Sequence, residues 1–304
     1  MSDLSHGAAW IGGRILPIAE ASIPVTDWGL THSDIAYDVV PVWKGAFFRL
    51  NDYVDRFMDS LAYWRMDVGM STDEITAALA QMVTASGLQD AYVAMVGSRG
   101  RNPIPGSRDP RDCDNHFYAW CVPYVHIVKP EQAQRGTSVW IAKSVRRIPK
   151  DSVNPKAKNY HWGDFTSGLF EAKDHGFETT LLLDHQGNVT EGPGFNVFAL
   201  FGRTLVTSDH GVLHGITRGT VLEMAQARGL NIETRALPLE EFWTADEVML
   251  SSSGGGVIPV ARVDEHHFSN GAAGPVARQL RSDYFSWLEQ DRFRTLLTAW
   301  TAKV

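Results

Sequence analysis

Cysteine is almost absent from this sequence. Only Cys113 and Cys121 occur among its 304 residues, too few for the disulfide framework of a small secreted protein. No run of about 18 apolar residues, the length that a membrane-spanning helix needs, occurs anywhere. The N-terminal residues have neither the basic nor the apolar stretch of a secretory signal. We therefore expect a cytoplasmic protein with two reduced thiols and no transmembrane segment.

The charged residues show no dominant sign. The chain has 28 Lys and Arg residues against 35 Asp and Glu residues, a net charge of -7, and no long run of one sign. Proteins that bind nucleic acid usually concentrate basic residues on one face. We therefore expect the partners to be small molecules or a second copy of the chain, and neither nucleic acid nor a membrane.

Several signatures of enzymes are also missing. No G-x-x-x-x-G-K-[ST] loop occurs, and no G-x-G-x-x-G follows the first predicted strand, so the standard nucleotide-binding fingerprints are absent. The G-x-S-x-G turn of α/β-hydrolases is absent as well. The 11 histidines show no metal-binding spacing, and His266 and His267 stand in a polar turn. No metal site is expected.

Length and pattern predict a mixed α/β protein of two domains. A chain of this length exceeds what one hydrophobic core usually organises. Strand-like and helix-like segments alternate throughout, and 44% hydrophobic with 21% charged residues is typical of globular proteins. The stretch V-K-P-E-Q-A-Q-R-G is polar, so we place a linker at residues 125–135, between a smaller domain at 1–124 and a larger one at 136–304.

Local signals predict individual helices. Asn51 and Ser71 are candidate N-caps, and Ser71 with Glu74 forms a capping-box pattern in a helix that Gly87 ends. A further helix is predicted at residues 162–175, with one apolar side made of Phe165, Leu169, Phe170 and Ala172.

Two segments offer backbone N–H groups to a phosphate. Gly215-Ile216-Thr217 begins a predicted helix, whose first turn and dipole favour an anion. The run 251–256 ends a predicted strand in three serines and three glycines. Either segment alone is more often an ordinary turn. Glu191, in T-E-G-P-G-F-N, is either a surface turn residue or a buried carboxylate that meets a cation such as a protonated ring nitrogen.

Two lysines, Lys156 and Lys158, stand one residue apart in N-P-K-A-K-N-Y-H-W-G-D-F. Taken alone, both are typical of a solvent-exposed turn, and no local spacing rule distinguishes them. A lysine amine attacks a carbonyl only when it is neutral, a state that burial favours. The aromatic residues that follow are one source of burial.

The order of four motifs resembles a known family. K-N-Y-H-W-G-D, T-E-G-P-G-F-N-V, G-V-L-H-G-I-T-R and S-S-S-G-G-G-V-I-P follow one another as in the class IV (fold type IV) pyridoxal-phosphate aminotransferases. The resemblance runs from about Gly12 to about Asp264, and the ordered set is far more specific than any single motif. T-H-S-D-I-A-Y-D-V-V-P-V-W, V-R-R-I-P-K and G-L-F-E-A are most similar to the (R)-selective amine transaminases.

The resemblance implies pyridoxal 5'-phosphate as cofactor, the two-domain architecture of fold type IV, and a homodimer. It implies a transaminase that moves an amino group from a primary amine, of (R) configuration, to a keto acid or ketone in a ping-pong cycle. Alternatives of the same fold are a D-amino-acid or branched-chain amino-acid aminotransferase and an aminodeoxychorismate lyase, which needs no amino acceptor. A binding module that kept only the scaffold would be expected to lack Lys158 or Glu191, and both are present.

The resemblance also implies roles for single residues. Lys158 matches the lysine that forms the Schiff base with the cofactor, which makes Lys156 its exposed neighbour. Glu191 matches the carboxylate that pairs with the ring nitrogen. The phosphate-binding positions fall on Arg56 and on the two glycine-rich segments, at Gly215, Ile216, Thr217, Ser252 and Ser253. The substrate-pocket positions are His32, Tyr37, Val39 and Trp162.

One position departs from the pattern of the subgroup. Its members carry, after V-T-R-G, an arginine that pairs with the carboxylate of the acceptor. Aligning V-G-S-R-G puts Pro105 at that position, and Arg101 and Arg108 of the same loop are the candidates to replace it.

Overall fold

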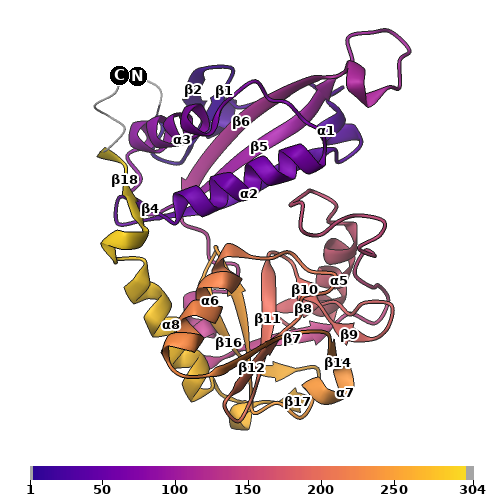
Figure 1. Ribbon diagram of the computed structural model, residues 1–304, viewed down its shortest axis with the longest axis vertical. Coiled ribbons are helices and arrows are strands. Elements are labelled where there is room, and N and C mark those ends of the chain that lie inside the picture. Colours follow the sequence, from indigo (N-terminus) through magenta and orange to yellow (C-terminus); the bar gives the residue numbers. More distant parts are fainter. Residues whose placement is uncertain (1–2, 299–304) are drawn as a thin grey trace. The chain divides into compact units, whose positions relative to one another are not determined.

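The computed structural model describes residues 3–298 and divides, by its contacts, into two compact units. The first unit consists of the described residues up to Val125, Ala157–Tyr160, and the described residues from Leu288 on. The second unit consists of His126–Lys156 and His161–Trp287. Each unit combines a sheet with helices (Figure 1), so the mixed α/β class is confirmed.

The first unit is a seven-stranded antiparallel sheet in the order β18-β4-β3-β5-β6-β1-β2. Helix α2 packs on β3, and α3 packs on β1 and β6 (Figure 1). The strands are β1 (Ala8–Ile11), β2 (Arg14–Pro17), β3 (Ile35–Trp43), β4 (Ala46–Phe48), β5 (Ala91–Arg101), β6 (Asp114–Pro123) and β18 (Arg294–Leu296). The helices are α1 (Trp28–Thr31), α2 (Leu50–Tyr63) and α3 (Thr72–Ser86), with short 3-10 turns η1 (Ile18–Glu20), η2 (Pro110–Asp112) and η4 (Asp291–Phe293).

Two segments from later in the chain pair with strands of the first unit. Residues 157–160 lie beside β3 through a bridge between Ala36 and Asn159, and β18 pairs with β4. Composition placed both segments in the domain at 136–304. The contacts instead place both segments in the first unit. Composition does not reveal this, because pairing between residues far apart in the chain leaves no local signal.

The two faces of the first sheet differ in chemistry, because neighbouring residues of a strand point to opposite sides. Asp38 is fully buried and binds Arg56 of α2 on the face that the helix covers. Tyr37 and Val39 point to the other side. There they belong to a cluster that we call the aromatic face, which consists of Ile35, Tyr37, Val39, Tyr92, Ala94, Val96, Tyr118, Trp120 and Tyr160.

The helices of the first unit follow the local signals closely. Ser71 Oγ accepts from Glu74 N, the reciprocal bond is present, and Gly87 ends α3 with a φ of 73°, so the predicted capping box and stop are confirmed. Helix α2 is capped at Arg49 and not at Asn51. The reason is that Arg49 adopts a left-handed conformation, with a φ of 54°, and turns the chain out of β4 directly into the helix.

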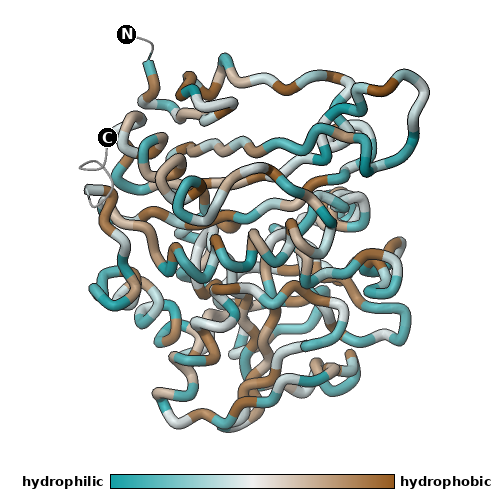
Figure 2. Tube along the Cα trace, turned by 45° about the horizontal axis from the view of Figure 1, so that its top comes forward, coloured by the Kyte–Doolittle hydropathy of each residue, from teal (hydrophilic) through white to brown (hydrophobic). Residues whose placement is uncertain are grey.

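The second unit is built on a nine-stranded mixed sheet. Its main path has the order β13-β12-β11-β15-β16-β7-β8, with β10 beside β11 and β17 beside β16, while β9 and β14 form a separate pair. The strands are β7 (Thr137–Ile141), β8 (Thr179–Leu181), β9 (Asn188–Val189), β10 (Glu191–Gly192), β11 (Phe195–Phe201), β12 (Thr204–Thr207), β13 (Asn231–Thr234), β14 (Leu237–Pro238), β15 (Glu247–Ser252), β16 (Gly256–Val263) and β17 (His266–His267). Hydrophobic residues, brown in Figure 2, recur along the central strands and form the core of this unit.

The helices of the second unit are α4 (Pro130–Arg135), α5 (Gly163–Asp174), α6 (Ile216–Ala227), α7 (Leu239–Phe242) and α8 (Pro275–Trp287), with the 3-10 turn η3 (Ser269–Gly271). Helix α4 occupies the polar stretch that we expected to be a linker, because Pro130 starts a helical turn and Ala133 is buried. Phe165 and Ala172 are buried as expected, but Phe170 is 69% exposed. Helix α5 buries Phe165, Gly168 and Ala172 instead, a stripe that leaves Phe170 outside. Within residues 3–298, none of the helices has both the length and the apolar character that crossing a membrane requires.

Candidate active site

Glu191 is a buried carboxylate of the second unit, only 4% exposed. Arg147 Nε donates to Oε1 at 3.0 Å. The backbone N–H of Leu213 and the side-chain amide of Asn196 donate to Oε2 at 2.9 and 3.3 Å. The alternative of a surface turn residue is therefore wrong. These three donors come from different parts of the chain and fix the orientation of the carboxylate.

Arg147 is shared between Glu191 and a second carboxylate. Its Nη1 donates to Asp164 Oδ2 at 2.7 Å, and the same oxygen accepts from the backbone N–H of Ile148 at 2.9 Å. The guanidinium also lies 4.3 Å from the centre of the Phe165 ring. Burial lowers the pKa of Arg147, but Glu191 and Asp164 outweigh this and raise the pKa above its ordinary value. Arg147 is therefore a permanent cation.

The two predicted phosphate-binding segments lie together at the start of α6. Gly215 is the N-cap of this helix, and no side chain of the described residues caps its first turn. The hydroxyl groups of Thr217 and Ser253 are 3.5 Å apart, so the helix start and the end of β15 form one group. Ser252 instead accepts from the backbone N–H of Gly254 at 3.1 Å and holds the turn. An uncapped helix start with neighbouring hydroxyls fits a phosphate.

Asn196 connects the phosphate-binding group with the carboxylate. Besides Glu191, its amide contacts the carbonyl of Leu213, the residue two positions before the N-cap Gly215. A Cβ atom at position 215 would lie 2.3 Å from Asn196 Oδ1, so any other residue there would require the Asn196 side chain to shift. Ser251 is the partner of Asn196 in the β11–β15 ladder and therefore points to the same face.

The hydroxyl of Ser251 is a sign that this group of residues binds a ligand. Its Oγ is buried and has no hydrogen-bond partner among the described residues. Buried polar atoms rarely remain unsatisfied in a folded protein. With the carboxylate on one side and the helix start on the other, the residues present fit a cofactor that carries a ring nitrogen and a phosphate.

The two lysines lie in different surroundings. Lys156 belongs to the second unit and is exposed, and its backbone N–H donates to Asn154 Oδ1 in a local turn. Lys158 belongs to the first unit and is half-buried. Its carbonyl accepts from Tyr37 N at 3.1 Å, its N–H donates to Ser60 Oγ at 3.1 Å, and its Nζ lies 4.4 Å from the centre of the Tyr37 ring. The structure thus separates two residues that no local spacing rule distinguished.

Arg56 is a partly buried cation of the first unit, and a fully buried carboxylate binds it. Its Nε and Nη2 donate to the two oxygens of Asp38 at 2.8 and 2.7 Å. Burial lowers the pKa of Arg56, but Asp38 outweighs it and raises the pKa. The side chain of Arg56 is 13% exposed and that of Asp38 is not exposed at all. The arginine is thus held in one orientation by the pair.

The expected substrate-pocket residues divide into three groups. Tyr37 and Val39 lie on the aromatic face, where Lys158 also lies. His32 is exposed and stacks on Trp28 with ring centres 4.5 Å apart. Trp162 belongs to the second unit and packs against Phe165. Tyr92, Tyr118 and Trp120 of the aromatic face escaped the sequence reasoning, although the alternating aromatic residues in H-F-Y-A-W were a signal for Tyr118 and Trp120.

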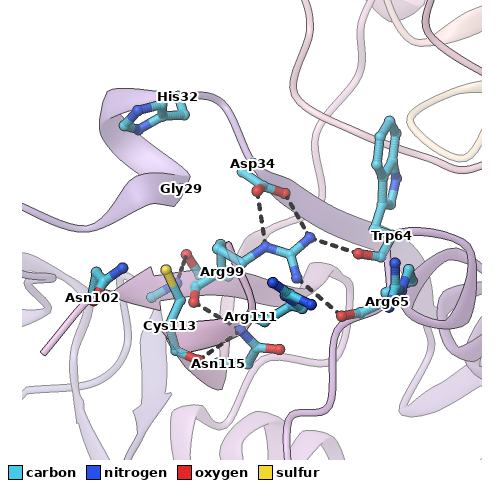
Figure 3. Close-up of polar contacts among 12 residues, drawn as sticks. Gly29, His32, Asp34, Trp64, Arg65, Arg99, Asn102, Arg111, Cys113 and Asn115 are labelled. Atoms are coloured by element: carbon cyan, nitrogen blue, oxygen red, sulfur yellow. Dashed lines mark hydrogen bonds and ion pairs between the residues drawn. The ribbon is translucent and has the colours of Figure 1, made fainter. Parts of the chain in front are cut away.

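The arginines near Pro105 differ in how they are bound. Arg99 is buried and binds Asp34 through Nε and Nη2, and it also donates to the carbonyls of Trp64 and Arg65 at 2.6 and 3.0 Å (Figure 3). Arg99 therefore binds the carbonyl groups at the C-terminal end of α2 and stabilises the fold. Arg101 and Arg108 are exposed and, within residues 3–298, form no ion pair.

Arg101 also lines a hollow of about 460 Å³ in the first unit, together with Thr26, Trp28 and Pro105. Arg108 is not part of this lining. Among the described residues, no group of three or more His, Cys, Asp or Glu side chains could hold a metal ion. Arg101 is thus the arginine of this loop that stands at a hollow large enough for a small ligand.

Comparisons with known proteins give a consistent match. The model of the family described as amino-transferase class IV matches residues 36–263. The D-alanine aminotransferase of Bacillus licheniformis is 28% identical over 89% of this chain and 93% of its own length. The branched-chain-amino-acid aminotransferase of Salmonella typhimurium is 26% identical over 91% of each chain. The crystal structure of the branched-chain amino acid aminotransferase from Thermobaculum terrenum in its PLP form is 26% identical, with a TM-score of 0.83, and the match covers 97% of this chain and 99% of that one.

Proposed function

We infer the function of this chain from its family: it belongs to the class IV aminotransferases and is a pyridoxal-phosphate-dependent aminotransferase. We propose that its amino donor is a primary amine of (R) configuration and that its acceptor is a keto acid or a ketone. The two half-reactions follow one another in a ping-pong cycle.

We propose the following roles for the residues of the two units. Pyridoxal phosphate, when bound, withdraws electrons from the substrate carbon that loses its proton. Lys158 Nζ would hold the cofactor covalently until the amine of the substrate takes its place, and the freed amine of Lys158 would then take the proton from the substrate carbon and return it. Glu191 pairs with the ring nitrogen. Phosphate-binding roles are proposed for Arg56 of the first unit and, in the second unit, for Gly215, Ile216, Thr217, Ser252 and Ser253, among which Ser252 would act by shaping the turn.

The aromatic face is the observation that supports an amine as donor. Beside Lys158 it presents the rings of Tyr37 and Tyr160, whose centres are 4.3 Å apart, and the aliphatic side chain of Val39. An amine with hydrocarbon substituents fits this lining. An amino acid brings a carboxylate next to the reacting carbon, and a carboxylate requires a cation or several N–H donors.

The second candidate is an amino-acid aminotransferase, which the relatives favour. The matched proteins are named branched-chain-amino-acid and D-alanine aminotransferases. For this function Arg101 is the residue that we expect to pair with a substrate carboxylate, because it lines the hollow in the first unit.

A half-reaction screen decides between the two candidates. The cofactor-loaded enzyme is mixed with (R)-1-phenylethylamine, (S)-1-phenylethylamine, D-alanine and L-leucine, and the absorbance of the bound cofactor is followed. We expect (R)-1-phenylethylamine to bleach it at the lowest concentration. Bleaching by L-leucine alone, or by D-alanine alone, would establish the second candidate. Formation of pyruvate from aminodeoxychorismate without an acceptor would identify a lyase.

We also propose that the enzyme is a homodimer. Val25, Leu30 and Ile104 are large apolar side chains that are at least half exposed. They belong to the segments around α1 and to the loop that lines the same hollow as Trp28. Exposed apolar side chains that gather in this way favour a protein contact. Light scattering is expected to give twice the mass of the chain, and a monomer at micromolar concentration would contradict the proposal.

A further inference from the structure

Glu191, Arg147 and Asp164 form a row of alternating charges in the second unit. The side chains of all three are less than a tenth exposed. Arg147 uses Nε for Glu191 and Nη1 for Asp164, so the guanidinium is fixed at two points. None of the functions assigned so far requires Asp164. A carboxylate buried with an arginine that already has a partner is costly unless it serves the site or the fold.

Other charged side chains lie near the row. The row alone contains one arginine and two carboxylates. Arg218, which is buried on α6, and Asp209 add one charge of each sign. The exposed side chain of His210 contacts Asp209, and solvent screens this pair. Within the row, the carboxylates outnumber the arginine by one.

We propose that Arg147 and Asp164 are positioning residues that hold the proton on the ring nitrogen of the cofactor through Glu191. This inference rests on the proposed role of Glu191. Arg147 orients Glu191 through Nε, but its positive charge also weakens the attraction between Glu191 and a cation. Asp164 cancels the charge of Arg147, so Glu191 acts on the ring nitrogen with its full negative charge.

The competing explanation is that Asp164 serves only the fold. It accepts hydrogen bonds from the backbone N–H groups of Ile148 and Phe165, and so anchors the loop after β7 and the first turn of α5. If Asp164 had this role alone, its substitution would change the free energy of unfolding. It would leave the protonation of a cofactor atom unchanged.

The test is the ¹⁵N NMR shift of the bound cofactor, labelled at its ring nitrogen, in the wild-type enzyme and in D164N. The shift reports directly whether the nitrogen carries a proton and does not depend on turnover. We expect the ratio of protonated to unprotonated ring nitrogen to fall about tenfold in D164N. The matched control is E171Q, which removes another carboxylate of α5, one that is held by neutral donors. It should leave the shift unchanged.

Two further variants, E191Q and R147K, distinguish a failure of the proposed function from a failure of the inference on Asp164. E191Q tests the proposed function: a wild-type shift in E191Q would reject the role of Glu191 itself. A changed shift in E191Q together with a wild-type shift in D164N would reject only the inference on Asp164. R147K keeps the charge but loses the two-point contact, and we expect a smaller loss of protonation. If D164N does not fold, a wild-type shift in R147K overturns the proposal.

Discussion

Each unit contains a buried arginine bound to a carboxylate, but the two pairs are arranged in opposite order. In the first unit, Asp38 is fully buried behind Arg56, so the pair presents a cation. In the second unit, Arg147 stands behind Glu191 and is itself held by Asp164, so the row presents an anion. A phosphate requires the first arrangement and a protonated ring nitrogen requires the second.

The difference shows how a buried side chain can stay charged and still attract a ligand. A single buried ion would shift its pKa and neutralise itself, and a single buried pair has little charge left to offer. The pair in the first unit places the arginine toward the outside, 13% exposed. The row in the second unit adds a third group instead. Removing single members of either set is therefore expected to give unequal effects.

The largest expected effect comes from Lys158, for which we propose a role that neither charged set can replace. Lys158→Ala should lose the visible absorbance of the covalently bound cofactor and lower kcat by about 10³-fold or more, because proton transfer at the substrate carbon loses its base. Lys156→Ala, in the neighbouring turn and exposed, should stay within about twofold of the wild type. Absorbance spectra and steady-state rates of both variants decide this, and an active Lys158→Ala variant would overturn the assignment.

Next in size is the stability of the arginine of the first unit. Asp38→Asn removes the carboxylate charge that binds Arg56 at two points, which costs about 3–5 kcal/mol in the free energy of unfolding without cofactor. Asp164→Asn should cost less, because Arg147 keeps Glu191. Adding pyridoxal phosphate should restore part of the loss in Asp38→Asn, since the phosphate supplies a new anion. Urea unfolding with and without cofactor measures all of these quantities, and an equal cost for both variants would contradict the comparison.

Two neighbouring serines of β15 give a smaller and more selective effect. Ser251→Ala removes a buried hydroxyl that has no partner, so the free energy of unfolding without cofactor should stay the same or rise by about 1 kcal/mol. Its cofactor Kd should rise about fivefold if the hydroxyl faces the ligand. Ser252→Ala loses the bond from Gly254 and should destabilise the protein by about 1 kcal/mol. Fluorescence titration with pyridoxal phosphate and urea unfolding separate the two serines.

The smallest expected effect concerns Glu171, a carboxylate of α5 that is held by neutral donors in place of an arginine. Partial burial alone would raise its pKa, but hydrogen bonds from Ser144, Trp140 and the backbone of Lys143 lower the pKa to about 2. Its contribution to stability is therefore complete above pH 4.5, its ordinary value, and is lost as the pH falls toward 2.

Glu171→Gln should accordingly cost about 1 kcal/mol at pH 7, since solvent screens the site. The difference from the wild type should shrink as the pH is lowered below 4. Urea unfolding at pH 7 and at pH 3 measures it. A difference that stays constant across this range would show that the hydrogen bonds do not depend on the charge of Glu171.

Prediction from the sequence succeeded where the physical cause is local. The capping box at Ser71 and Glu74, the stop at Gly87 and the helix start after Gly215 each depend on residues within four positions of one another. It was less accurate for α2, where the conformation of Arg49 moved the cap, and for Phe170, where packing against the sheet chose a different stripe of α5. Both errors come from tertiary contacts that override a local preference.

The candidate site divides in the same way. The ordered motifs identified Lys158, Glu191 and the two phosphate-binding segments as candidates. Arg147 and Asp164 were not found, because an arginine and an aspartate without a characteristic spacing carry no signal on their own. Arg147 lies 44 positions from Glu191 in the chain. Ser251 was part of a predicted segment, but only its pairing with Asn196 shows which way its hydroxyl points.

The sequence by itself determined the family, the cofactor and the local elements, since motif order and helix caps are written in consecutive residues. The tertiary structure alone decided which of two lysines is half-buried, and that Glu191 is a buried carboxylate and not a surface turn residue. Burial and charge pairing depend on which distant strands meet, and the bridge from Ala36 to Asn159 is an example. For the same reason, the contact of Arg147 with Glu191 is found only in the folded chain.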